Sequence, residues 1–239
     1  MAESINTATG RTRDTRSIRR LSVRAGAVLL GALLSCGCMN ARVEQSRSAV
    51  TGIQDGEAVV VLARSLHNGN ETETKFIDCV DKSLTLGQPA LRVIDDAAFR
   101  DSFYPWFEPR TAPRAASDLG TLLTEDALAT KLRKENVRYL VWVEGSTEAR
   151  DGGGGISCAA GPGGGGCVGL MWWEKDSVYE AAIWDLKNSR SVGEVKADVN
   201  GMSVVPALIV PVPMIAPTQG KACKRLAEQL RSFLVEGVS

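Results

Sequence analysis

The stretch Val137-Arg-Tyr-Leu-Val-Trp-Val-Glu144 is the clearest strand signal in the chain. Its β-branched and aromatic residues are those that fit a pleated, buried surface. Two shorter apolar runs upstream, Glu57-Ala-Val-Val-Val-Leu-Ala63 and Leu91-Arg-Val-Ile94, predict two more strands. Helical spacing of apolar residues predicts helices over 73–86, 95–103 and 121–136, the second capped by Asp95. Strands and helices that alternate in this way are typical of an α/β domain.

The pattern changes after Glu144. Segments 169–173, 178–185 and 191–199 predict successive antiparallel strands, with turns at Glu174-Lys-Asp-Ser177 and Lys187-Asn-Ser-Arg190. A last apolar periodicity, from Thr218 to Glu236, predicts a closing helix. The expected fold class is therefore α/β (α+β): a mixed sheet with an antiparallel meander in its second half and helices packed on it.

The N-terminus has the composition of an export signal. Residues 1–24 contain six arginines against Glu3 and Asp14, and residues 25–34 contain no charge. That uncharged run is too short to span a membrane, which takes about 20 residues. It ends in Leu33-Leu34-Ser35-Cys36, which resembles the bacterial lipobox. The alternative is an ordinary cleaved signal peptide in which the cysteine is incidental.

The lipobox resemblance implies cleavage before Cys36 and acyl chains, palmitate among them, on that cysteine. The implied organisation is a signal peptide over 1–35, a lipidated tether over 36–56 and one periplasmic domain over 57–239. Under the sorting rule of enteric bacteria, Gly37 after the cysteine implies the outer membrane, with the domain facing the periplasm.

The net charge of the chain limits the classes of partner that we expect it to bind. The whole chain has 28 basic and 28 acidic residues, and loss of residues 1–35 would leave 22 basic and 26 acidic. A net charge of −4 provides no basic excess that could release counterions from a nucleic acid. The expected partners are therefore the membrane, through the N-terminal lipid, and an envelope protein; no nucleic acid is expected.

Four cysteines follow the lipobox region, and an oxidising compartment would pair them. Two disulfides among four cysteines allow three connectivities. Cys158 and Cys167 are nine residues apart on either side of glycines, so in one of these connectivities they would pair with each other and close a loop. Cys79 and Cys223 would then join an early helix to the last one. The segment Asp151–Cys167 is predicted to be a long hairpin loop closed by the first of these disulfides, and the alternative is a binding loop for a small ligand.

Motifs for catalysis are lacking in the sequence, and we predict that the protein is not an enzyme. His67 is the single histidine, and the cysteine spacing does not match a zinc site, so no metal and no cofactor is expected. The carboxylate pairs Asp95-Asp96, Asp78/Asp81 and Glu125-Asp126 lie where helices favour acidic residues. Because glycosidase carboxylates can lie far apart in sequence, an envelope hydrolase that acts on cell-wall glycan remains an alternative.

Two stretches are candidates for contact with a partner. The first is Phe103-Tyr-Pro-Trp-Phe107, in which Phe103, Tyr104, Trp106 and Phe107 are the candidate anchors because aromatic residues dominate interface hot spots. The second is Val204–Pro217, an apolar segment with four prolines. This segment is expected either to cover a sheet edge or to form an exposed surface that touches a membrane or a partner.

Residues 57–145 resemble the periplasmic α/β domains of envelope lipoproteins of the curli-secretion and synthase-activator types. The resemblance rests on the early Val59-Val-Val-Leu62 strand followed by a helix, and on the later strand Tyr139-Leu-Val-Trp-Val143. Proteins of those types act through partners. The resemblance therefore implies a lipid-anchored, non-enzymatic partner-binding or assembly factor.

Overall fold

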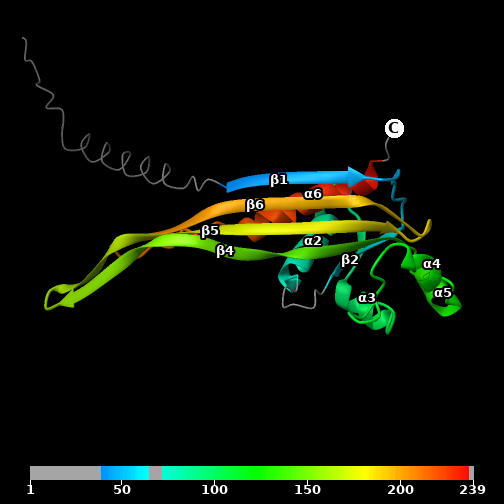
Figure 1. Ribbon diagram of the computed structural model, residues 1–239, viewed down its shortest axis with the longest axis horizontal. Coiled ribbons are helices and arrows are strands. Elements are labelled where there is room, and N and C mark those ends of the chain that lie inside the picture. Colours follow the sequence, from blue (N-terminus) through cyan, green and yellow to red (C-terminus); the bar gives the residue numbers. More distant parts are fainter. Residues whose placement is uncertain (1–38, 65–71, 237–239) are drawn as a thin grey trace, which may run out of the picture. The chain divides into compact units, whose positions relative to one another are not determined.

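The computed structural model describes residues 39–64 and 72–236. They form a six-stranded sheet in the order β1-β6-β5-β4-β2-β3, with helices on both faces (Figure 1). The strands are β1 (Met39–Arg47), β2 (Ala58–Ala63), β3 (Arg92–Ile94), β4 (Val137–Gly161), β5 (Gly164–Asp185) and β6 (Arg190–Ile209). The helices are α2 (Thr74–Leu86), α3 (Asp96–Ser102), α4 (Asp118–Leu122), α5 (Asp126–Lys134) and α6 (Thr218–Val235).

The sheet is mixed, as predicted. β2 runs parallel to β3 and β4, whereas β4, β5, β6 and β1 pair antiparallel in turn. Strand β2 is apolar along its length because helices cover both of its faces, which is usual for parallel strands. The predicted fold class, with an antiparallel second half and a closing helix, is confirmed.

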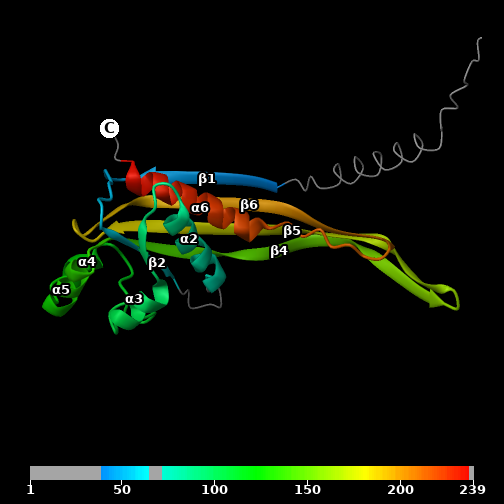
Figure 2. The same ribbon diagram turned by 180° about the vertical axis from the view of Figure 1, so that it is seen from behind.

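Two hydrophobic cores lie on opposite faces of the sheet. Side chains that alternate along β4 divide between them, with Tyr139 and Val141 in one core and Leu140 and Trp142 in the other. Helices α2 and α6 cover the first face and lie side by side on it (Figure 2). Helices α3, α4 and α5 cover part of the second face, where Phe99, Leu119 and Leu128 are buried.

The second half differs from the prediction in the length of its strands. Residues 174–177, expected as a turn, lie inside β5, and the glycine-rich segment is strand rather than loop. β4 continues to Gly161 and pairs with β5 as far as the Gly161–Gly164 pair. The physical reason is that the ladder is made of backbone hydrogen bonds, which glycines form without leaving any side-chain pattern in the sequence. The turn predicted near 187–190 is confirmed between β5 and β6.

The folded domain also begins earlier than predicted. Residues 40–56 were expected to be a tether, but β1 pairs with β6 from Met39 to Arg47. Ala41 and Val43 pack against the core, and the Arg47 guanidinium lies 4.0 Å from the centre of the Phe233 ring. The signal peptide, Cys36 and His67 lie outside the described residues. None of the described helices is both long enough and apolar enough to span a membrane.

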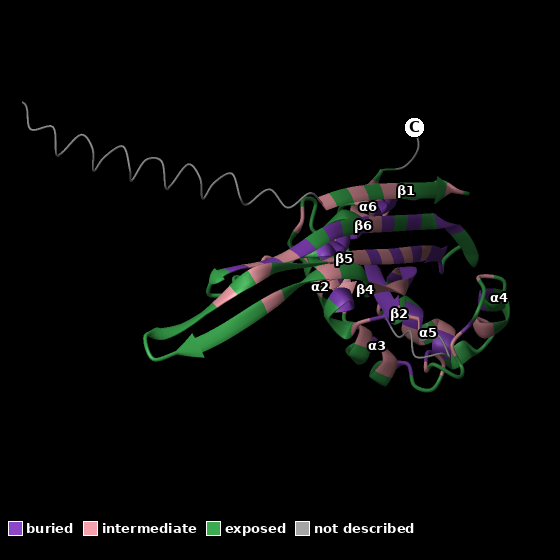
Figure 3. Ribbon diagram, turned by 60° about the vertical axis from the view of Figure 1, so that its left-hand side comes forward, coloured by how far each residue is buried: buried purple, intermediate pink, exposed green. Residues whose placement is uncertain are grey.

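Strands β4, β5 and β6 continue well beyond the helices, and their far part is largely exposed (Figure 3). This extension begins beyond the first residue of β1, because Met39 pairs with Gly201 of β6. We call residues 152–173 and 201–217 the arm, and the rest of the described domain the head. Within the arm, the returning segment 210–217 folds back along β6, with backbone bridges between Val204 and Met214 and between Ala207 and Pro211.

Candidate functional site

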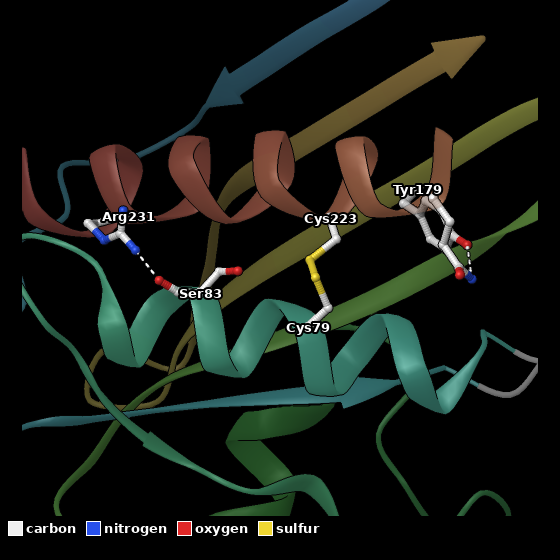
Figure 4. The surroundings of a disulfide bond; sticks show 6 residues. Cys79, Ser83, Tyr179, Cys223 and Arg231 are labelled. Carbon is white, nitrogen blue, oxygen red and sulfur yellow. Dashed lines mark hydrogen bonds between the residues drawn. A yellow bond between two sulfur atoms is a disulfide. The ribbon is translucent and has the colours of Figure 1, made fainter. Parts of the chain in front are cut away.

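Two disulfides are present, in one of the three connectivities that the sequence left open. Cys79 of α2 is bonded to Cys223 of α6, 144 residues later, with their Cα atoms 6.2 Å apart (Figure 4). Cys158 and Cys167 face each other across β4 and β5, with their Cα atoms 4.0 Å apart. The first disulfide ties the two helices that cover one face of the head. The second closes the arm near its tip.

A buried polar cluster lies where the arm leaves the head. The hydroxyl of Tyr179 donates to Glu73 at 2.6 Å and lies 2.8 Å from the hydroxyl of Thr147. Ser177, fully buried in β5, donates to Thr218 at 2.9 Å. Burial, helped by the hydrogen bond to Glu73, raises the pKa of Tyr179 well above its usual value. The hydroxyl therefore stays protonated as a donor, and the cluster joins α2, α6, β4 and β5.

Asp81 on α2 is the one acidic residue in the described chain with a strongly raised pKa. Burial first, and then the nearby charges of Asp95, Asp96 and Asp78, raise its pKa to about 8. One of its carboxylate oxygens is buried without a hydrogen-bond partner. Asp95 instead caps α3 by accepting from the Ala98 amide at 3.0 Å, as predicted, and Asp96 pairs with Arg100. No group of three or more potential metal ligands occurs among residues 39–64 and 72–236.

The four candidate aromatic anchors divide between core and surface. Phe103 and Phe107 are 1% and 0% exposed and pack with Phe99 in the second core, so they have no surface to offer a partner. Tyr104 is 70% exposed and Trp106 is half-buried, and these two remain candidate contact residues. The four-residue spacing of Phe99, Phe103 and Phe107 is the sequence signal that could have indicated a shared buried face.

The largest exposed apolar surface belongs to the arm. Leu208, Ile209 and Val210 are 80%, 73% and 66% exposed at the far end of β6. The other large apolar side chains exposed on the arm are Val168, Leu170, Met171, Trp172, Met202, Val212 and Ile215. The returning segment 210–217 covers the free edge of β6, which is the first of the two alternatives for Val204–Pro217, and several of its apolar side chains are exposed.

Glycines of β4 lie directly across from the bulky residues of β5. Gly152, Gly153 and Gly154 pair with Trp173, Trp172 and Met171. A Cβ atom at Gly153 would lie 3.3 Å from the Trp172 ring, so the missing side chain gives that ring room to lie on the backbone. This segment pairs with β5 along one edge, so it is a strand and not a loop that cradles a ligand.

Charged residues occur up to the base of the arm but not within it. No Asp, Glu, Lys or Arg occurs between Gly152 and Trp173, or between Gly201 and Gly220. Immediately outside these limits, Arg150 and Asp176 form an ion pair at 2.6 Å, and Glu174 and Lys175 follow in β5. The arm is therefore an uncharged, apolar element bordered by charged residues.

Comparison with known proteins gives only distant similarity. No family model matches the chain, and no curated protein matches it. Among solved structures, the dodecamer of a PelC point variant from Paraburkholderia phytofirmans is 14% identical, with a TM-score of 0.40, over 82% of this chain and 100% of that one. The PelC dodecamer from the same organism in another crystal form gives 13% identity and a TM-score of 0.39, over 82% and 99%.

Proposed function

We propose that this protein is a lipid-anchored component of the cell envelope that acts by contact with other envelope components and not by catalysis. The observation that carries the proposal is the arm, on which large apolar side chains are exposed without an intervening charge. Contiguous exposed apolar surface on a folded protein marks a site of contact. These side chains lie on a three-stranded extension of the sheet.

Export to an oxidising compartment is supported by the two disulfides, since such bonds persist outside the cytosol. Acylation of Cys36 is supported by the lipobox, which follows a basic segment and a short apolar run. We place the anchored protein at the outer membrane, facing the periplasm, because Gly37 follows the cysteine.

The arm is the leading contact surface, and the exposed ring of Tyr104 with the half-buried ring of Trp106 is the second. This order reverses the sequence-based expectation, because two of the four aromatic residues in 103–107 are core residues. Contact through the arm would require no change in the packing of the helices in the head.

Anchoring can be tested by the intact mass of the protein extracted from membranes without reductant. We expect a chain that starts at Cys36, carries an acyl-glyceryl modification and lacks the four hydrogens lost in forming two disulfides. An unmodified chain that still starts at Met1, with free thiols, would exclude the envelope role.

Contact through the arm can be tested by photo-cross-linking in living cells. A photo-reactive residue at Leu208 should give an adduct with another envelope component. The same residue at Glu44, exposed on β1 of the head, is the matched control and should give none. Equal labelling from both positions, or none from Leu208, would contradict a contact role for the arm.

A further inference from the structure

We infer that the arm docks into the interfacial layer of the membrane that holds the acyl anchor, so that lipid is the component it contacts. This inference rests on the proposed anchoring at Cys36 and specifies what the arm touches. Its basis is the position of the arm, its lack of charge, the distribution of its apolar side chains and its unpaired strand edge.

The arm lies at the end of the sheet where the anchor is attached. Cys36 precedes Met39 by three residues, and three residues reach at most about 10 Å. Met39 pairs with Gly201, the first residue of the arm in β6. The chain therefore cannot carry an acylated Cys36 farther than about 10 Å from Met39, the residue that pairs with the base of the arm.

The absence of charged side chains on the arm favours contact with lipid. Neither segment of the arm contains an ionised side chain, so no desolvation of a charge opposes its entry into an apolar layer. The charged residues resume at once on the head side, with Arg150, Glu174 and Lys175. Trp172 and Trp173 lie at this boundary, and tryptophan is the residue enriched where a membrane meets water.

Apolar side chains are exposed on both sides of the arm. Val168, Leu170 and Trp172 alternate along β5 and share one face, whereas Met171, 40% exposed, lies on the opposite face. A folded protein partner would bury one face and leave the other in water. A layer of acyl chains and headgroups can surround both.

The unpaired outer edge of β4 limits how deeply the arm can enter the membrane. Among the described residues, β2 pairs with β4 only as far as Val143, so the outer edge of β4 in the arm has no partner strand. Unpaired backbone groups are not tolerated in the hydrocarbon core. The arm is therefore expected to lie in the interface, where water still reaches that edge, and not to cross the bilayer.

The test uses the mature protein reconstituted in vesicles of phosphatidylethanolamine and phosphatidylglycerol, with and without brominated acyl chains, which quench tryptophan. We expect quenching in the wild type and its loss in the Trp172→Phe/Trp173→Phe double variant. Leu208→Asp should reduce quenching to the level of that double variant. Leu86→Asp is the matched control, since Leu86 is 69% exposed on the head, and it should leave quenching unchanged.

Vesicle flotation and intact mass report the anchor separately. An acylated protein that floats with the vesicles but shows no quenching from Trp172 and Trp173 would overturn the inference and leave the proposed anchoring intact. A protein adduct, rather than a lipid adduct, from the photo-reactive residue at Leu208 would overturn it in the same way. A chain without acylation would instead refute the proposed function.

Discussion

The disulfide between Cys79 and Cys223 should be the main covalent support of the head. Its two cysteines are 144 residues apart, so the bond closes a loop that contains most of the folded domain. Loop-closure entropy of the unfolded chain gives a stabilisation of about 5 kcal/mol for a loop of this length. For the disulfide in the arm, whose cysteines are nine residues apart, the same relation gives about 3 kcal/mol.

The double variant Cys79→Ala/Cys223→Ala should therefore melt roughly 10–20 °C below the wild type, since 1 kcal/mol corresponds to a Tm shift of 2–4 °C in a domain of this size. Alanine is the appropriate replacement because Cys223 is completely buried, and a serine hydroxyl there would need a hydrogen-bond partner. Differential scanning calorimetry under non-reducing conditions measures the effect.

Cys158→Ala/Cys167→Ala is the matched control. Because that disulfide lies in the exposed arm, its loss should appear as faster hydrogen exchange in residues 152–173, with a smaller shift in the melting of the head. If both double variants lower the Tm equally, or if the first lowers it by less than about 5 °C, loop closure is not the source of the head's stability.

Three further outcomes are expected. Asp81→Asn should stabilise the protein at pH 8.5 relative to pH 4, because a folded pKa of about 8 lets the native state hold a proton that the unfolded chain loses from about pH 4 upward. Wild-type stability should fall over that window, and parallel melting curves for both proteins would contradict this. Gly193→Ala should destabilise the protein by about 2–4 kcal/mol, because φ is +146° and the added Cβ would clash with the Ser46 carbonyl oxygen. Gly220→Ala in α6, where an added Cβ meets nothing within 4 Å, should be neutral or stabilising in denaturant titrations. Tyr179→Phe should cost about 1.5–3 kcal/mol in the same titration, because Glu73 loses its 2.6 Å donor, and an unchanged midpoint would show that water replaces it.

The parallel half of the sheet could be predicted because its strands are buried on both faces and therefore read as continuous apolar runs. The run Ala58–Ala63 and the stretch 137–143 carry that signal and lie where it places them. Helix α6 was equally readable, because its buried residues recur at helical spacing from Ala222 to Leu234. The number of disulfides could also be predicted from the four cysteines, whereas the structure selects one of the three connectivities that the sequence left open.

The arm could not be predicted because the β4 side of its ladder is rich in glycine, whose backbone bonds leave no side-chain pattern in the sequence. Residues 174–177 have the composition of a turn, yet Ser177 is a buried strand residue that bonds to Thr218. Strand β1 was missed for a related reason, since only Ala41 and Val43 mark its inner face. Whether such segments form strands depends on the strand with which they pair, and that strand is distant in the sequence.

The pairing of β1 also has a mechanical consequence. If the protein is held by Cys36, any force on the anchor enters the domain at Met39, the first residue of β1. The nine pairs between β1 and β6 run antiparallel, and their hydrogen bonds stand across the strand direction. A pull along β1 loads those bonds together in shear, whereas a sideways pull would open them one at a time. The first strand thus acts as a force-bearing clamp, so that movement of the envelope would displace the head as a unit and not unravel it from its N-terminus.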